Sequence, residues 1–265
     1  VDVGDDVIAD GFLTGPRSAG AHRQYGGFAT WALAPQEALI PLPPTLSFDQ
    51  GCCLLGNYET AWHCRVARGR LAAGKTVLIH GASGFTSLAA VHVAKLLGAT
   101  VIATGRNPDK LAIVKAQGAD HVIACTGTEG AGGGPRFRDE VKALTEGRGV
   151  DVVYDSVGKD TFPGSLDCLK PRGMWVSFGQ SSGNVEPFPL ATLSQKGSLY
   201  MTRPTLFTYI ASREDLVASA NALFDVITRK IVTIDINQRY AMADAKQAHE
   251  DLENRKTTGT TVLLP

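Results

Sequence analysis

The chain has 265 residues, enough to bury a large core and to form two domains. Its 26 basic and 26 acidic residues balance and form no long block of one sign, which argues against nucleic acid or an anionic membrane as a partner. The five cysteines lack the spacing of a disulfide framework, and no apolar run is long enough to cross a membrane. We therefore expect a globular, cytoplasmic protein.

The first 50 residues contain short β-like runs broken by Gly and Pro, at 7–8, 28–33 and 38–40. This pattern predicts an antiparallel, barrel-like unit. Ser47 is predicted to cap a following helix, and a second helix is expected over 60–67. The chain opens without Met on a segment typical of the middle of a β domain, so we expect that residues belonging before it are absent from the chain as given.

From residue 75 onward, apolar runs alternate with segments of helical periodicity. Strands are predicted at 77–80, 100–103, 121–124, 151–154 and 174–178, and helices at 85–97, 138–145, 162–169 and from Pro108 with Asn107 as its cap. This alternation is typical of βαβ units and predicts an α/β fold with a doubly wound, parallel Rossmann sheet. Beyond it we expect helices at 213–229 and 243–254, and strands at 231–236 and 261–264. The Gly-rich segment 127–135 is predicted to be a mobile surface loop.

The turn after the first Rossmann strand carries the main functional signal. It has glycines at Gly81 and Gly84 and a serine at Ser87, between an apolar strand and a helix. Backbone N–H groups and the positive end of a helix dipole at such a turn bind phosphate. The spacing is Gly-x-x-Gly-x-x-Ser and differs from Gly-x-Gly-x-x-Gly, so a tight turn without a ligand remains the alternative.

The end of the second strand distinguishes between the two nicotinamide dinucleotides. An acidic residue there binds the ribose 2′-hydroxyl of NAD, whereas a basic one accommodates the 2′-phosphate of NADP. Arg106 follows this strand, Lys110 lies one helical turn on, and the first acidic residue is Asp109. These cations favour NADP(H), and a solvated surface pair is the alternative. Asp155 and Ser156 follow a later strand, where they serve either as caps or as ligand contacts.

Several stretches closely resemble the zeta-crystallin-like quinone oxidoreductases of the medium-chain dehydrogenase/reductase superfamily. They are residues 152–158, 165–173, 176–179, 195–200, 202–204 and 248–250. The resemblance spans nearly the whole chain and implies a GroES-like catalytic domain, only partly present, split around the Rossmann domain. The corresponding ranges are 1–57 and 201–265 for the catalytic domain and 58–200 for the Rossmann domain. It also implies NADPH as cofactor and a small quinone as substrate. Segment 198–201 resembles the edge strand through which these enzymes form homodimers, although the chain's own missing part is an alternative cover for it.

The resemblance also implies roles for single residues. The positions expected to bind NADPH are Thr60 near the nicotinamide; Ser83, Gly84, Phe85 and Thr86 at the pyrophosphate turn; Arg106 and Lys110 at the 2′-phosphate; Phe178, Gly179 and Gln180 along the nicotinamide; and Cys125, Ser156 and Arg255. The chain departs from the family at Phe85 and Ser87, which replace the end of a Gly-Gly-Val-Gly turn, and at Cys125, which replaces a Tyr. The departure at Phe85 bears on the affinity or pose of the cofactor.

No metal is expected. Residues 1–51 contain no Cys, so the four ligands of the structural zinc in zinc-dependent relatives are missing. Asn57 stands where their catalytic zinc takes a thiolate. The remaining cluster of Cys52, Cys53, His63 and Cys64 lacks a metal-ligand spacing, and its cysteines are expected to be small buried side chains.

The sequence therefore predicts reduction of quinones with NADPH, by hydride or electron transfer and without zinc. A quinone accepts hydride without a protein acid, so no catalytic residue is assigned. An enoyl or alkenal double-bond reductase is one alternative. A non-catalytic NADPH-binding protein is another, favoured by Phe85, Ser87 and Cys125.

Overall fold

The structure is a computed structural model, and it describes residues 1–15, 18, 20–24, 26–63, 71–125 and 134–265. The chain divides into two compact units: unit 1 comprises residues 1–60 and 206–265, and unit 2 comprises residues 61–205. The domain boundaries expected at 57 and 200 stay a prediction.

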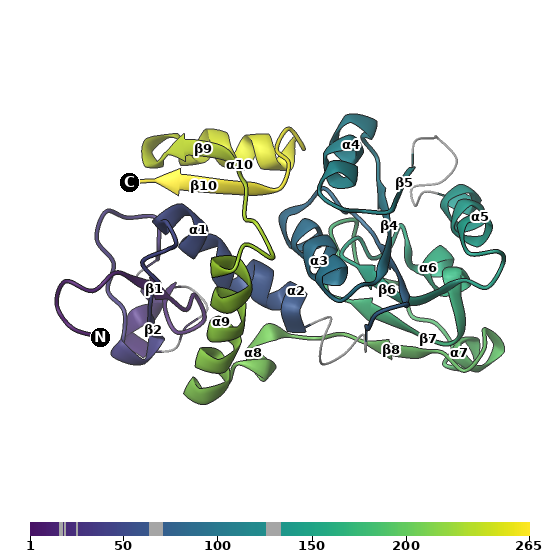
Figure 1. The fold of residues 1–265 in the computed structure, drawn as a ribbon, viewed down its shortest axis with the longest axis horizontal. Helices are drawn as coiled ribbons and strands as arrows, with labels where there is room; N and C mark the ends of the chain where they lie inside the picture. Colours follow the sequence, from purple (N-terminus) through teal and green to yellow (C-terminus); the bar gives the residue numbers. More distant parts are fainter. Residues whose placement is uncertain (16–17, 19, 25, 64–70, 126–133) are drawn as a thin grey trace. The chain divides into compact units, whose positions relative to one another are not determined.

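The described part of unit 2 is built on a six-stranded parallel sheet (Figure 1). Its strands, in spatial order, are β5 (His121–Ala124), β4 (Thr100–Gly105), β3 (Thr76–Ile79), β6 (Val150–Asp155), β7 (Leu169–Ser177) and β8 (Tyr200–Thr202). The chain starts at the centre, moves outward to β5, and returns to place β6 beside β3. This order is that of a doubly wound Rossmann fold, with its switch point between β3 and β6. The predicted α/β fold is confirmed.

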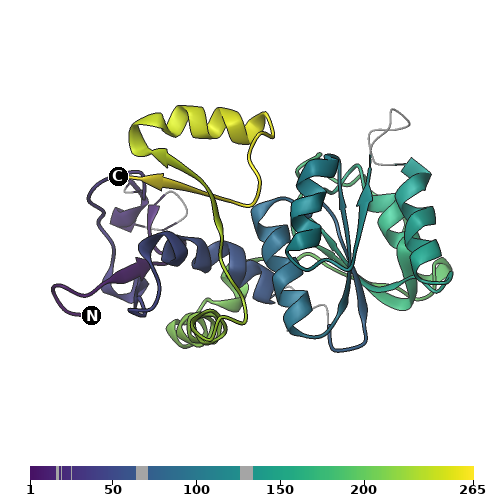
Figure 2. The ribbon, with the colours of Figure 1, turned by 45° about the horizontal axis from the view of Figure 1, so that its top comes forward.

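Helices cover both faces of this sheet. They are α3 (Phe85–Leu96), α4 (Pro108–Ala116), α5 (Gly134–Leu144), α6 (Phe162–Cys168) and α7 (Ala191–Gln195). Figure 2 shows α3 and α4 on one face and α5 and α6 on the other. Because both faces are covered, the central strands are almost wholly apolar, as in β3, where Val77, Leu78 and Ile79 are fully buried. The cap predicted for α4 is confirmed, since Asn107 Oδ1 accepts a hydrogen bond from the Lys110 amide at 3.1 Å.

Unit 1 contains two small sheets and several helices. Its elements are β1 (Val7–Ala9), β2 (Leu39–Pro41), α1 (Phe48–Cys53), α8 (Leu206–Tyr209), α9 (Arg213–Thr228), β9 (Ile236–Ala241), α10 (Ala245–Glu253) and β10 (Thr260–Leu264). The short helix α2 (Glu59–His63) begins in unit 1 and ends in unit 2. Short helical turns lie at Gly20–Gln24, Gln36–Ala38, Leu54–Tyr58 and Met242–Asp244. β1 and β2 are antiparallel, whereas β9 and β10 are parallel and joined through α10. Ser47 forms a capping box with Gln50, which confirms the predicted start of α1.

Two predicted strands are wrong. Residues 28–31 form bends and 32–33 have no regular secondary structure, and none of them pairs in a sheet with the described residues. Trp31 is 90% exposed, so the β-like run of apolar residues here does not indicate a half-buried strand. The run predicted over 231–236 closes α9 instead: Lys230 takes a φ of +55°, and the amides of Ile231 and Val232 both donate to the carbonyl of Val226. The next strand, β9, therefore begins only at Ile236.

Two further predictions fall partly outside the described residues. Segment 64–70 holds the end of the helix expected over 60–67, together with Cys64, and segment 126–133 holds most of the Gly-rich loop. The described remainder shows that α2 spans Glu59–His63 and that α5 already begins at Gly134, inside the predicted loop.

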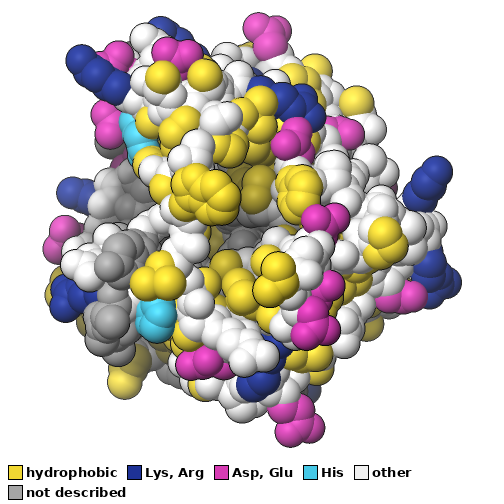
Figure 3. Space-filling model, turned by 90° about the vertical axis from the view of Figure 1, so that its left-hand side faces the viewer, with side chains coloured by type: hydrophobic (Ala, Val, Ile, Leu, Met, Phe, Trp, Pro, Cys, Tyr) yellow, Lys and Arg dark blue, Asp and Glu magenta, His cyan; other side chains and the backbone are white. Residues whose placement is uncertain are grey.

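Unit 1 exposes several large hydrophobic side chains, among them Phe28, Trp31 and Phe48. The space-filling view in Figure 3 shows hydrophobic side chains gathered near the middle of the face that it presents, with charged side chains around the margin. Among the described residues, no helix combines the length and the apolar character needed to cross a membrane.

Candidate functional site

Two serine hydroxyls link the carboxyl ends of β3 and β6, the two strands at the switch point. The Oγ of Ser156, just after β6, donates to the carbonyl of His80 at 3.1 Å, and the Oγ of Ser87 donates to the same carbonyl at 3.2 Å. The two hydroxyls lie 3.2 Å apart. Gly81 has a φ of +60°, and a Cβ there would lie 3.0 Å from the Ser156 hydroxyl. Glycine is therefore required for this close approach, and Ser87 holds the turn in place of the family's glycine.

Helix α3 begins directly at this turn. Gly84 is its N-cap, with the Gly84 amide donating to the Gly81 carbonyl at 3.0 Å and the Leu88 amide donating to the Gly84 carbonyl at 2.8 Å. A glycine cap has no side chain to occupy the space in front of the helix. Phe85 and Thr86, in the first turn, are half-buried. The positive end of this 12-residue helix thus lies at the carboxyl end of β3, where an anion is stabilised.

The segment after β7 packs directly on the end of β6. The amide of Phe178 donates to the carbonyl of Asp155 at 2.9 Å. A Cβ on Gly179 would lie 2.6 Å from the carbonyl oxygen of Ser156, so no residue with a side chain fits there without a shift of the backbone. The carboxyl ends of β3, β6 and β7 therefore meet in one packed region.

Arg203, just beyond β8, clamps this segment. Its Nη1 donates to the carbonyls of Ser177 and Gly179 at 3.2 and 3.1 Å, and its Nη2 donates to Gln180 Oε1 at 3.2 Å. The sequence did not assign Arg203 a place in the site. Its only signal was its position in one of the stretches that resemble the family.

A buried carboxylate lies beneath the switch point. Asp155 is fully buried at the end of β6. Its oxygens accept hydrogen bonds from five donors: Val157 N at 2.9 Å, Gly158 N at 3.0 Å, Thr161 Oγ1 at 2.8 Å, Ser165 Oγ at 3.2 Å and Trp175 Nε1 at 3.1 Å. The donors come from the segment after β6, from α6 and its N-cap, and from β7, and together they satisfy the hydrogen-bonding capacity of the carboxylate. Asp155 was expected either to cap the next segment or to contact a ligand, and these contacts support the capping role.

His80 extends the same network toward β4. Its Nδ1 lies 2.8 Å from Thr104 Oγ1, and its Nε2 lies 3.1 Å from Ser165 Oγ, which in turn contacts Asp155. Burial lowers the pKa of His80, against the smaller opposing effect of the Asp155 carboxylate, so the ring is neutral near pH 7. No local pattern predicts this link, because a histidine inside a strand is usually a packing residue.

The residues proposed for the 2′-phosphate follow β4. Arg106 is exposed, and Lys110 in the first turn of α4 is partly buried, which lowers the pKa of its ammonium group. Cys125 lies beside them, since its amide donates to the Gly105 carbonyl at 2.7 Å. Burial raises the pKa of the Cys125 thiol, against a smaller lowering by Thr104, and the thiol is therefore protonated at neutral pH.

Thr60 and Arg255 belong to unit 1. The Thr60 hydroxyl donates to the carbonyl of Gly56, and Arg255 follows α10 with a φ of +60°. The carboxyl ends of β3, β6 and β7 belong to unit 2, so contact of Thr60 and Arg255 with the cofactor stays a prediction.

The sequence missed a buried acid next to Thr60. Glu59 is fully buried, and neither carboxylate oxygen has a hydrogen bond of good geometry among the described residues. Burial raises the pKa of Glu59 to about 7, against smaller lowering effects of Ser219 and Gly56, while Asp10 raises it further. Glu59 is therefore partly protonated near neutral pH.

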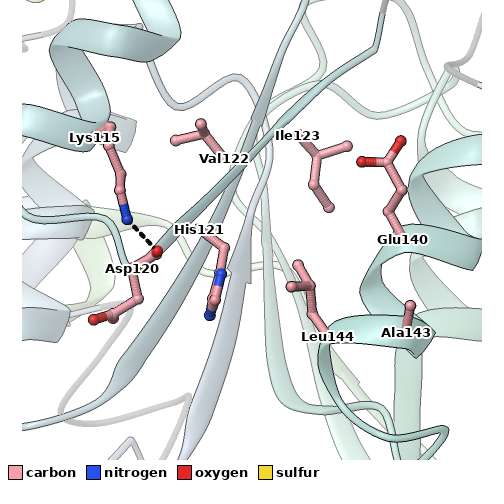
Figure 4. Close-up of a pocket in the computed structure, with 8 residues that line it drawn as sticks. All are labelled: Lys115, Asp120, His121, Val122, Ile123, Glu140, Ala143 and Leu144. Carbon is pink, nitrogen blue, oxygen red and sulfur yellow. Dashed lines mark hydrogen bonds between the residues drawn. The ribbon is translucent and has the colours of Figure 1, made fainter.

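One cavity of unit 2 lies along β5, away from the residues predicted to bind NADPH. In the described residues, no group of three or more His, Cys, Asp or Glu side chains is placed to hold a metal ion. A cavity of about 370 Å³ runs along β5 (Figure 4). There Lys115 contacts the Asp120 carbonyl, and Glu140 and Leu144 reach in from α5. None of the residues predicted to bind NADPH lines this cavity.

The chain is similar over almost its full length to a known enzyme. It is 41% identical over 263 residues to the quinone oxidoreductase of Pseudomonas aeruginosa, covering 99% of this chain and 78% of that protein. The chain belongs to the quinone oxidoreductase family. This membership agrees with the resemblance seen in the sequence, which is thereby confirmed.

Further comparisons place the quinone oxidoreductase family within a wider group. Residues 86–222 match the family model described as zinc-binding dehydrogenase. The crystal structure of the Escherichia coli quinone oxidoreductase complexed with NADPH aligns with a TM-score of 0.85 at 35% identity, covering 100% of this chain and 76% of that one. A 2-haloacrylate reductase from a Burkholderia species is 34% identical, over 96% of this chain and 75% of that protein.

Proposed function

We propose that this chain catalyses the NADPH-dependent reduction of quinones. The observation that carries the proposal is the match, over the whole chain, to a quinone oxidoreductase whose structure holds NADPH. The turn between β3 and α3 supports it independently, because it lies at the switch point where Rossmann folds bind dinucleotides.

The residues of unit 2 fit this cofactor. The start of α3, with Ser83, Gly84, Phe85 and Thr86, binds the pyrophosphate through backbone amides and the helix dipole. A Cβ on Gly84 would meet only the Gly81 carbonyl, at 3.4 Å, so this side of the turn is open enough for close approach of an anion. Arg106 and Lys110 hold the 2′-phosphate, and Arg106, the residue directly after β4, stands where an acidic residue would bind the ribose hydroxyl of NAD.

The remaining residues orient the reacting ring. When bound, NADPH supplies a hydride from its nicotinamide to the quinone. Phe178, Gly179 and Gln180 form one wall beside the nicotinamide, and Arg203 fixes their backbone. Thr60, Cys125, Ser156 and Arg255 complete the cofactor contacts. The hydroquinone oxygens take their protons from water, so the chain contributes positioning in place of an acid.

The reaction proceeds without zinc. The support is the donor set: residues 1–51 hold no Cys, and Asn57 stands where a thiolate would be needed. Cys52, Cys53, Cys125 and Cys168 are free thiols, as in a reducing cytoplasm. Balanced charge supports a small-molecule substrate over a nucleic acid or membrane partner. Pairing of two chains along β8 makes the enzyme a homodimer.

Reduction of a conjugated carbon–carbon double bond is the second candidate. It is favoured by the similarity to the 2-haloacrylate reductase. A non-catalytic NADPH-binding protein is the third, because Phe85, Ser87 and Cys125 depart from the family pattern.

Titration with NADPH and NADH, followed by nicotinamide fluorescence, and then a turnover assay test these functions. We expect NADPH to bind more tightly than NADH, and quinones to be reduced faster than 2-haloacrylates or enals. Faster reduction of the double-bond substrates would establish the second function. Binding without turnover on either substrate class would establish the third, and no binding of either dinucleotide would refute all three.

A further inference from the structure

Two cysteines follow one another at the end of α1. Both are free thiols, and Cys52 is exposed whereas Cys53 is buried. The sequence predicted small buried side chains at both positions, which is confirmed for Cys53 and wrong for Cys52. Neither thiol is among the residues proposed to bind NADPH, so the pair is available for other chemistry.

The sulfur atoms of this pair lie close together, although consecutive side chains of a helix normally diverge. The Cys52 thiol donates to the carbonyl of Asp49, three residues earlier, at 3.2 Å. The Cys53 thiol donates to the same carbonyl, four residues earlier, at 3.0 Å. Because both side chains bend back toward one acceptor, the two sulfurs come within 3.8 Å of each other.

The contact between the sulfurs makes the two thiols unequal. The hydrogen bond with Cys53 lowers the pKa of Cys52, against the opposing effects of burial and of the Asp49 carboxylate. The same hydrogen bond, together with burial, raises the pKa of Cys53. Cys52 is therefore the nucleophile of the pair, and Cys53 keeps its proton at neutral pH.

The separation of the sulfurs selects the kind of ligand that fits them. Zinc needs three or four protein ligands, and within the part of the chain that the structure describes no group of three His, Cys, Asp or Glu side chains could hold a metal ion. A disulfide needs sulfurs about 2.05 Å apart, much closer than they are here. One atom bonded to both sulfurs at about 2.3 Å, the length of a zinc–thiolate bond, spans the pair with only a small shift of the side chains. The pair therefore suits a ligand that two thiols satisfy through a single bridging atom.

We propose that Cys52 and Cys53 form a binding site for trivalent arsenicals that carry one organic group. Such an arsenic atom has two further valences, and the two thiols fill them. The exposed Cys52 sulfur bonds first, and Cys53 closes the bridge. With an arsine oxide, two arsenic–sulfur bonds form, the arsenic–oxygen double bond breaks, and the oxygen leaves as water with both thiol protons. The arsenic stays trivalent, so the step needs no oxidant or reductant.

Phenylarsine oxide is the probe, and native mass spectrometry of the full, reduced chain is the measurement. A bridge across two thiols adds the mass of the probe less one water, whereas a bond to one thiol adds the whole mass of the probe. Excess glutathione is present, so that arsenic held by one thiol exchanges away. Cys52→Ser and Cys53→Ala each remove one sulfur, the first at an exposed position that leaves the core intact. Cys125→Ser is the matched control, because it removes one partly buried thiol from unit 2.

We expect the parent and Cys125→Ser to bind one equivalent of the probe with loss of water, and 2,3-dimercaptopropanol, which itself offers two thiols, to release it. Cys52→Ser and Cys53→Ala each bind the probe about a hundredfold more weakly, because the second, intramolecular bond is lost. The proposal is overturned if the parent shows no bridged adduct, if the bridge persists in Cys52→Ser or in Cys53→Ala, or if Cys125→Ser loses it.

Discussion

The charges of Arg106 and Lys110 give the most direct test of cofactor choice. Replacing Arg106 with Glu puts an acid where the ribose hydroxyl of NAD is bound and repels the 2′-phosphate. We expect the affinity for NADPH to fall by about tenfold to a hundredfold, as for a lost hydrogen bond between charged groups, and the affinity for NADH to rise. Nicotinamide fluorescence measures both. Arg148→Glu, at an exposed site in the same unit, is the control; an unchanged NADPH/NADH ratio in Arg106→Glu would refute the role.

Ser87, which stands where the family has a glycine, stabilises the turn between β3 and α3. Its hydroxyl contacts the His80 carbonyl and the Ser156 hydroxyl inside the molecule. We expect Ser87→Ala to lower the free energy of unfolding by about 1 kcal/mol, the typical value of one hydrogen bond, and to leave NADPH affinity unchanged. Urea denaturation and fluorescence titration measure the two effects. Ser194→Ala, at an exposed hydroxyl that also contacts a backbone carbonyl, should be neutral. A large loss of NADPH affinity in Ser87→Ala would show that the hydroxyl contacts the cofactor.

Glu59 makes the stability of the chain depend on pH. Its folded-state pKa of about 7 lies above its ordinary value of 4.5, so between these pH values the folded chain binds more protons than the unfolded chain. The stabilisation from protonated Glu59 is complete below about pH 4.5 and is lost as the pH rises through about 7. The loss amounts to about 3 kcal/mol.

Glu59→Gln isolates this effect, because glutamine is neutral at every pH. We expect the variant to gain stability relative to the parent as the pH rises from about 4.5 to 8, by about 3 kcal/mol in all. Urea denaturation across this range measures the difference, and other titrating groups such as His80 contribute equally to both proteins. Glu253→Gln, at an exposed position, should show no such trend. A difference independent of pH would contradict the raised pKa.

At the scale of the elements, Asp155 joins β6 to α6 and β7. Its carboxylate is a pure acceptor that faces donors on every side, so Asp155→Asn puts an amide N–H₂ against other donors. We expect the free energy of unfolding to fall by about 3 kcal/mol or more. Chemical denaturation measures it, with Asp139→Asn, where the side chain is 70% exposed, as a control expected within about 0.5 kcal/mol of the parent. A neutral Asp155→Asn would contradict the network.

The Rossmann elements could be predicted from the sequence because each has a local cause. Apolar strands buried on both faces and Asn107 before Pro108 act within a few residues of the chain. The same is true of α1 in unit 1, where Ser47 lies three residues before Gln50. The strand predicted over 231–236 failed because the left-handed Lys230 turns the chain back to close α9. A lysine does not by itself predict a left-handed backbone conformation.

The site was predicted less completely than the fold. Position at a strand end was enough to single out Ser156 and Gly179. The network of His80, Asp155 and Ser165 joins residues up to 85 positions apart, so no local pattern could show it. The same holds for the Arg203 clamp, 26 positions from Ser177.

At the scale of the whole molecule, the open edge of the sheet is the surface through which we propose that two chains pair. Tyr200 and Met201 on β8 are 55% and 42% exposed, and in the described residues β8 pairs on one side only, with β7. A charge on such an edge opposes pairing with another chain. We expect Met201→Lys to convert the proposed homodimer to a monomer in sedimentation velocity, whereas Leu252→Lys, at an exposed position in unit 1, does not. A parent that is monomeric would refute dimerisation along this edge.

The discontinuity of unit 1 has a consequence for biosynthesis. Its halves are joined by contacts over very long sequence separations, such as Arg213 with the Glu37 carbonyl across 176 positions and Arg239 with Asp49 across 190. The parallel sheet of unit 2, by contrast, pairs strands that follow one another in the chain, except where β3 lies beside β6. On the ribosome, unit 2 can therefore acquire its structure while residues 1–60 still lack the segment that completes their core. During that interval the apolar side chains of residues 1–60 that pack against residues 206–265 lack those native partners, and apolar surface exposed in this way is prone to aggregation.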